Sequence, residues 1–192
     1  MRVVLQRVKS ASVSVSGTGV VGNIDKGLLV FLGICERDTE NPQPHLHWLI
    51  KKVSTARLFP NTEGKHWCES IKSLGLPILL ISQFTLHGNL RKPKPDFHHS
   101  AKTLPAREIW NMAIGEFKRE LGDDRVLTGE FGADMDVQLV NWGPVTLSLD
   151  SANKSETYFE DGVGDGGKKA LGEKVGALAA DVVVKTEWLE KL

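Results

Sequence analysis

The sequence predicts an α+β protein in which a mainly antiparallel sheet curls into a sandwich or barrel and carries two or three helices. Three observations lead to this fold class. Apolar and polar residues alternate with a period of two near both ends of residues 1–150, which is typical of half-exposed strands. Two runs, 27–34 and the first part of 76–86, are apolar throughout, as in strands buried on both faces. Two segments with helical spacing alternate too irregularly with the strands for a doubly wound fold.

The N-terminal segments predict a hairpin followed by a buried strand. Residues 3–8 and 11–15 each alternate between apolar and polar side chains. Residues 16–19 (SGTG) predict a turn, and 20–24 a short return strand. The run GLLVFLGI at 27–34 then predicts a strand with both faces covered.

Helices and further strands are predicted from the spacing that follows. Residues 45–58 and 106–121 both place apolar side chains near helical spacing, and Gly122 is a typical helix C-cap. Between them, 76–86 (LPILLISQFTL) predicts a buried strand whose C-terminal end is polar. Residues 126–149 lead into alternating strands that Gly-Pro interrupts.

Residues 1–150 and 151–192 differ in character. The first segment contains the strand and helix patterns and has the length of one domain. Residues 151–169 are polar and glycine-rich, as in a linker, and an amphipathic helical pattern follows them. With six lysines and eight acidic residues, 151–192 is negatively charged, which favours docking on protein over binding nucleic acid. We expect it to pack on its own domain.

Composition excludes several classes of function. The net charge of zero argues against nonspecific nucleic-acid binding over a broad positive surface. No apolar run is long enough for a membrane span or a signal peptide, so we expect a cytosolic protein. The two cysteines, Cys35 and Cys68, and the six histidines lack metal-ligand spacing, so no metal or cofactor is expected. Common signatures of hydrolase, protease and nucleotide-binding sites are also absent from the sequence.

Two short motifs carry the functional signal. SQFTL at 82–86 ends a predicted buried strand, and NWGPVT at 141–146 interrupts another. Together they resemble the SQFTL and NxGPVT motifs of the D-aminoacyl-tRNA deacylase family. The resemblance extends in order and spacing to QRV at 6–8, GLLVFLG at 27–33 and FGADMDV at 131–137. Residues 151–192 lie outside this family core, and the basic loop at 91–97 follows the family pattern only loosely.

The resemblance implies a cytosolic homodimeric hydrolase without a cofactor. It would cleave the ester between a D-amino acid, or glycine, and the 3′-terminal adenosine of tRNA, thereby proofreading translation. A cis Gly-Pro peptide would direct its carbonyls into the partner's pocket and reject L-amino acids, so that each active site is completed across the interface. The implied catalytic residues are Ser82, Gln83 and Thr85. The implied substrate-binding residues are Phe84, Phe131, Met135, Asn141, Gly143 and Pro144, with Arg7 holding the Gly-Pro carbonyls from behind.

Alternatives remain open for several of these residues. Gly143-Pro144 could be a simple strand interruption, Arg7 a surface cation, and Phe131 and Met135 ordinary core residues. A threonine nucleophile needs an adjacent base. His87 would share a face with Thr85 if the strand ran that far, but the family assigns it no role, and the 2′-hydroxyl of the tRNA could assist instead.

Two other functions compete with the D-selective enzyme. One is a non-catalytic nucleic-acid-binding module on the same fold, which the lack of interleaved aromatic and basic residues disfavours. The other is the achiral-selecting branch of deacylases, from which Arg7, Gln83 and Phe84 distinguish this chain.

Overall fold

The computed structural model describes residues 1–153, which form a six-stranded sheet and three α-helices. The predicted linker and tail helix lie almost wholly outside the described residues. No helix in residues 1–153 is long and apolar enough to cross a membrane. The elements in chain order are β1 (Arg2–Val15), β2 (Gly19–Ile24), β3 (Gly27–Gly33), η1 (Glu36–Thr39), α1 (Gln43–Thr55), α2 (Ile71–Leu74), β4 (Ile78–Ser82), η2 (Phe84–His87), α3 (Thr103–Leu121), η3 (Asp123–Arg125), β5 (Val126–Thr128) and β6 (Met135–Asp150).

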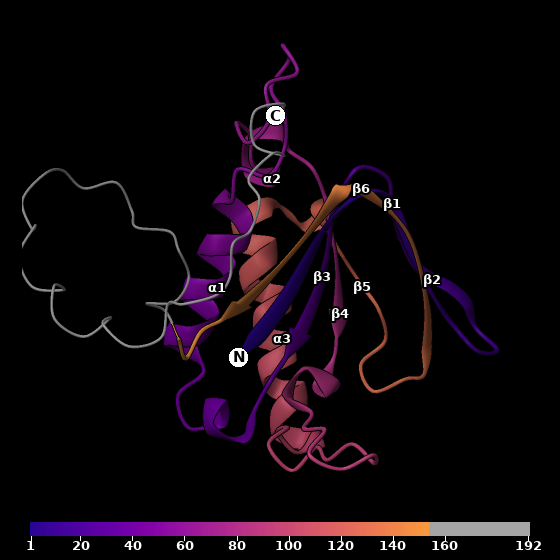
Figure 1. Cartoon of the computed structure of the whole chain (residues 1–192), viewed down its shortest axis with the longest axis vertical. Helices are drawn as coiled ribbons and strands as arrows, with labels where there is room; N and C mark the ends of the chain where they lie inside the picture. Colours follow the sequence, from indigo (N-terminus) through magenta and orange to yellow (C-terminus); the bar gives the residue numbers. More distant parts are fainter. Residues whose placement is uncertain (154–192) are drawn as a thin grey trace, which may run out of the picture. The chain divides into compact units, whose positions relative to one another are not determined.

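The long strand β1 organises the sheet. One edge pairs with β6 from Arg2 to Val15, as Figure 1 shows. The other edge pairs first with β3 and then with β2, and all three pairings are antiparallel. The two alternating segments at 3–8 and 11–15 are therefore halves of a single strand. The pairing with β6 shifts register between Gln6 and Ser10, and the adjacent Arg7 and Val8 in this stretch are both buried.

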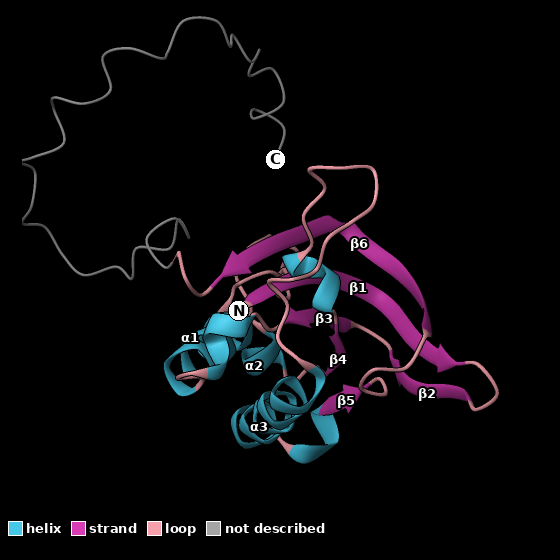
Figure 2. Cartoon of the chain, turned by 90° about the horizontal axis from the view of Figure 1, so that it is seen from below, coloured by secondary structure: helices cyan, strands magenta, loops and turns pink. Residues whose placement is uncertain are grey.

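The remaining pairings are parallel. Strand β4 pairs with β3 and β5 pairs with β4 in the same direction, so the sheet is mixed, with antiparallel pairs in the majority. Parallel neighbours need long crossovers, which here contain α1 with α2 and then α3. All three helices lie on one side of the sheet (Figure 2). This arrangement confirms the predicted α+β class.

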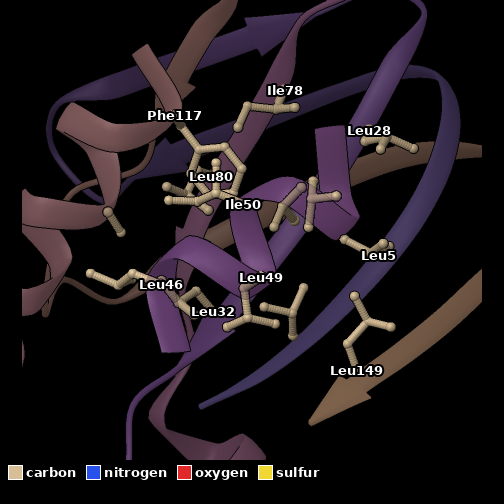
Figure 3. Close-up of a cluster of buried hydrophobic side chains, with 14 of the residues drawn as sticks. Leu5, Leu28, Leu32, Leu46, Leu49, Ile50, Ile78, Leu80, Phe117 and Leu149 are labelled. Carbon is tan, nitrogen blue, oxygen red and sulfur yellow. The ribbon is translucent and has the colours of Figure 1, made fainter. Parts of the chain in front are cut away.

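Two apolar cores lie on opposite faces of β3 and β4. Between the helices and the sheet, α1 and α3 bury their apolar faces against side chains such as Leu28 and Leu80 (Figure 3). On the other face, Leu29 and Leu79 meet the distal halves of β1 and β2. A Cβ on Gly22 would lie 2.8 Å from Leu79 Cδ1 and 3.0 Å from the Thr128 carbonyl oxygen. This close approach brings β2 beside β5 and almost closes the sheet into a barrel.

Several predicted boundaries are wrong. The helix predicted at 45–58 is α1 and ends at Thr55, although Leu58 beyond it is still buried. The strand predicted at 76–86 ends at Ser82, because the chain turns into η2. The short helix α2 was not predicted. It has the capping Ser70 and a left-handed Gly75, but with four residues it is too short for a periodic signal.

Candidate active site

A cavity of about 620 Å³ opens where the first motif leaves the sheet. Ser82, Gln83 and Phe84 line one side of it, and Phe131 and Met135 line another. Phe97, Ser100 and Thr103, from the loop before α3 and its first residue, also contribute to the wall. The fold thus joins five of the predicted site residues, although they are separated by almost fifty positions in the chain.

The way the chain leaves β4 determines where the polar residues of the first motif lie. The Gln83 N–H donates to the Leu32 carbonyl at 2.8 Å, which extends the β3–β4 ladder by one bond. Segment η2 then packs over Gly33, where a Cβ would lie 2.9 Å from the Gln83 carbonyl oxygen and from Leu86 Cβ. Only glycine permits that approach, so Gly33 determines where the motif leaves the strand.

Aromatic side chains form the rim of the cavity. Phe84 is 56% exposed and meets Phe97 edge to face, with ring centroids 5.0 Å apart. Ser100 Oγ donates to the Phe84 carbonyl at 2.9 Å, which ties the wall to η2. An exposed aromatic pair at a cavity mouth offers a flat apolar surface to a ring or an aliphatic group.

The opposite wall is supported from the core. Phe131 is half-buried, with its ring 6.1 Å from that of Trp110 and 4.9 Å from the Arg107 guanidinium carbon. Met135 is also half-buried, and its sulfur would lie 2.7 Å from a Cβ on Gly129. Both side chains therefore pack on the core and line the cavity.

Thr85 and His87 do not share a face. Within η2, Thr85 is exposed, and its Oγ1 accepts a hydrogen bond from Gln83 Nε2. His87 is buried and lines a different cavity. The expectation of a common face assumed an extended strand, and the 3₁₀ turn removes the period of two on which it rested.

The second motif lies outside this cavity. The Gly143-Pro144 peptide bond is cis, as the resemblance implied. Both residues are exposed, and neither lines the cavity that contains Gln83. Asn141 also lies away from that cavity. Its Oδ1 accepts from the Val145 N–H at 2.9 Å, and its Nδ2 donates to Thr146 Oγ1 at 3.1 Å, so it braces the turn from within.

Arg7 lies beneath the Gly-Pro turn and is 2% exposed, so the reading as a surface cation is wrong. Its Nε donates at 2.8 Å to the carbonyl of Trp142, the residue before Gly143, and its Nη1 donates to the Leu58 carbonyl. The Trp142 ring lies 4.8 Å from its guanidinium carbon. Burial lowers the pKa of Arg7, but an arginine stays charged at neutral pH.

Sequence reasoning missed the part of the wall that comes from the loop before α3. Phe97 and Ser100 fall in a basic, proline-containing segment without periodicity. Residues 132–134 also line the cavity, and only the family pattern marked them. A chain reversal brings the loop to the site, fixed by bonds such as the Ala101 N–H to the Ile34 carbonyl at 3.0 Å.

Comparisons with known proteins agree with the motifs. A D-aminoacyl-tRNA deacylase from Desulfotalea psychrophila is 43% identical over 152 residues, covering 79% of this chain and 97% of the relative. One from Drosophila melanogaster is 39% identical over 160 residues, covering 83% of this chain and 98% of the relative.

Solved structures show the same fold. A c-Myc DNA unwinding element binding protein superposes with a TM-score of 0.73 at 37% identity, over 78% of this chain and 98% of that one. A probable eukaryotic D-amino acid tRNA deacylase has a TM-score of 0.67 at 17% identity, over 77% of this chain and 97% of that one. The profile of the D-Tyr-tRNA(Tyr) deacylase family matches residues 4–150. The chain therefore belongs to the D-Tyr-tRNA(Tyr) deacylase family.

Proposed function

We propose that this protein hydrolyses the ester bond of D-aminoacyl-tRNA and releases the free D-amino acid and tRNA. The observation that carries the proposal is the cavity at the end of β4, where the polar residues of the first motif meet an aromatic rim. Such a site suits an aminoacyl-adenosine end, which has a flat base, a polar ester and a variable side chain. The cavity is about 620 Å³, in the range of small-ligand sites.

The chemistry assigned to the cavity is positioning and charge stabilisation. Ser82 and Gln83 supply a hydroxyl and an amide beside the reacting ester, where negative charge develops on the carbonyl oxygen. Phe84 offers its exposed ring to the adenosine or the aminoacyl group, and Phe131 and Met135 close the far side. Each of these roles follows from the kind of group present at the cavity wall.

Thr85 is a poor candidate for the nucleophile. The described residues place no histidine or carboxylate in hydrogen-bond contact with its hydroxyl, which accepts instead from Gln83 Nε2. His87 is buried on another side of η2. The 2′-hydroxyl of the terminal ribose lies next to the ester in the substrate itself, so it needs no placement by the protein. We assign the assisting hydroxyl to the RNA.

A homodimer would complete the site. Gly143 and Pro144 are exposed and lie outside the cavity of their own chain, so they would reach a cavity only in a second copy. Strand β6 pairs with β1 along one edge, and the described part of the chain leaves its other edge open. Val140, which is 53% exposed on β6, adds apolar surface there. An open edge strand with apolar residues is suited to pairing between subunits.

Rejection of L-amino acids would follow from the backbone of the Gly-Pro turn. In the dimer, its carbonyls would occupy the direction of an L side chain and leave the D direction open. Backbone groups suit this task because they do not depend on which amino acid is bound. Glycine has no side chain in either direction, so glycyl-tRNA should also be cleaved. The proposed setting is the cytoplasm, where aminoacyl-tRNA is made and used.

Release of amino acid from charged tRNA tests this function. With purified protein, we expect rapid release from D-tyrosyl-tRNA, measurable release from glycyl-tRNA and none above background from L-alanyl-tRNA. Hydrolysis of L-alanyl-tRNA together with the D-form would refute the backbone filter. No hydrolysis of any of the three by folded protein that still binds RNA would favour the non-catalytic module. Light scattering at micromolar concentration should give the mass of a dimer, and an active monomer would refute shared sites.

A second experiment separates the two sources of catalysis. Thr85→Ala should lower single-turnover deacylation only a few-fold, because one hydrogen bond to Gln83 is lost. A 2′-deoxy terminal adenosine should lower it by at least about a hundredfold, within the range attributed to general acid–base groups. A trapped acyl ester on Thr85, or normal turnover of the 2′-deoxy substrate, would make Thr85 the nucleophile.

A further inference from the structure

A cluster of three potential metal ligands lies outside the proposed active site. Cys35 precedes η1, Asp38 lies within η1, and His87 ends η2. One ligand atom from each residue, the thiol sulfur, a carboxylate oxygen and a ring nitrogen, lies within 4.8 Å of the other two. All three residues line a second cavity of about 580 Å³, which is separate from the cavity containing Gln83.

The ring of His87 provides an independent observation. His87 is 8% exposed, and its Nε2 is a buried nitrogen without a hydrogen-bond partner in the described residues. A buried polar atom left in this state normally costs about 1–3 kcal/mol, so a native protein tends to use it. The ring also makes a hydrogen bond with the Gly33 backbone. Because Nε2 itself has no partner within the described part of the chain, this nitrogen remains available for a ligand.

This arrangement matches that of a metal-binding histidine. Such histidines commonly donate one ring N–H to a backbone carbonyl and bind the ion through the other nitrogen. Asp38 is also held in place, because its Oδ2 accepts from the Cys35 N–H at 2.8 Å and its Oδ1 from the Met1 ammonium at 2.7 Å. Each carboxylate oxygen has a second lone pair, so these bonds leave a position for an ion.

We infer that Cys35, Asp38 and His87 form a binding site for a divalent transition metal of the zinc type. Thiolate, imidazole and carboxylate are the usual ligands of zinc, at about 2.0–2.3 Å. Ligand atoms around a tetrahedral ion are then about 3.3–3.8 Å apart, so the observed cluster must contract by roughly 1 Å. Cys35 is half-buried at the start of η1, and rotation of its side chain supplies this movement.

The proposed site must also balance charge and supply a fourth ligand. Binding displaces the thiol proton to solvent, so the thiolate and the Asp38 carboxylate face the two positive charges of the ion and the Met1 ammonium that already pairs with Asp38. The second cavity gives water access to the remaining position. Its other charged lining residues are mixed in sign, since Arg2 and Arg37 occur together with Glu36 and Asp150, and Arg2 Nε donates to Asp150 Oδ2 at 3.0 Å. The bound ion would tie η1 to η2 and so hold the turn that follows the first motif.

Cobalt titration of untagged, chelator-treated protein tests the site. We expect one Co²⁺ per chain, with the near-ultraviolet charge-transfer absorption of a cobalt–thiolate bond and the visible bands of a four-coordinate ion. Zn²⁺ should displace it stoichiometrically. Cys35→Ser should abolish the charge-transfer band and weaken binding at least tenfold, and His87→Gln should weaken it by a similar factor.

The second cysteine provides the matched control. Cys68 is also half-buried but does not line the second cavity, so Cys68→Ser should keep both the band and the affinity. If His87→Gln does not fold, thermal denaturation of the other variants tests the site. One equivalent of Zn²⁺ should raise the Tm of the wild type and of Cys68→Ser, but should not raise the Tm of Cys35→Ser. Absence of the thiolate band, its persistence in Cys35→Ser, or its loss in Cys68→Ser would overturn the inference. None of these readouts depends on deacylase activity.

Discussion

Replacing Arg7 with methionine should weaken both the fold and the Gly-Pro turn. Methionine keeps most of the apolar stem but removes the guanidinium, so the carbonyls of Trp142 and Leu58 each lose a charged hydrogen bond. Such a bond contributes about 1.5–3 kcal/mol. Removing a buried charge also removes its desolvation cost, which offsets part of the loss. We expect a net loss of roughly 2–4 kcal/mol in the free energy of unfolding.

Urea denaturation and thermal denaturation measure this loss. For a chain of this size, each kcal/mol lowers the Tm by about 2–4 °C, so Arg7→Met should melt roughly 4–16 °C below the wild type. Arg2→Met is the matched control on the same strand. Arg2 is 48% exposed, and its bonds to Asp150 and to the Leu86 carbonyl lie at the surface, so their loss should cost at most about 1 kcal/mol.

Deacylase assays distinguish a role of Arg7 in positioning the Gly-Pro turn from a role in overall stability alone. Because its Nε holds the carbonyl next to Gly143, the loosened turn should impair deacylation even where the variant is fully folded. Discrimination between D- and L-substrates should fall as well. A urea midpoint for Arg7→Met no lower than that of Arg2→Met would refute the stabilising role. Unchanged selectivity in a folded variant would refute the positioning role.

Three other changes give sharp expectations. In Gly143→Ala, the new Cβ would lie 2.8 Å from Val145 Cγ2, and the backbone φ of 136° is unfavourable for alanine. We therefore expect a lower Tm and lower deacylase activity, and a Tm equal to that of the wild type would refute this expectation. A chain ending after Asn153 should keep deacylase activity in a release assay, because the cavity, both motifs and the buried Ser151 precede the cut. A truncated chain that folds but is inactive would show that residues after Asn153 belong to the site. Burial acts to raise the pKa of Asp150, but hydrogen bonds from the Ala152 N–H and Arg2 outweigh it and lower that pKa. The wild type should therefore be more stable than Asp150→Asn by about 0.5–1 kcal/mol at pH 7, and lose the advantage as pH falls through the lowered pKa; equal urea midpoints at pH 7 would contradict this.

Local patterns were enough to predict most elements of the fold. Strands β2 and β3 and helix α3 could be located from the sequence because apolar periodicity and the capping Gly122 are properties of consecutive residues. The two motifs likewise indicated the candidate site, because a family pattern is also read along the chain. The exit of β4 at Ser82 was missed, since no local feature distinguishes an extended FTL segment from a 3₁₀ turn.

Tertiary contacts decided what local patterns could not. The turn at η2 depends on its packing over Gly33, a residue fifty positions earlier. The same turn separates Thr85 from His87 and brings His87 to Cys35 and Asp38, whose spacing in the sequence resembles no metal motif. The surface-cation alternative for Arg7 could be rejected only from the structure, in which β6 has extra residues opposite Arg7 and its Trp142 carbonyl accepts from the arginine. Apolar periodicity indicates which side of a helix or strand is buried. Which residues meet at a site depends instead on the segments, distant in the sequence, that pack against that side.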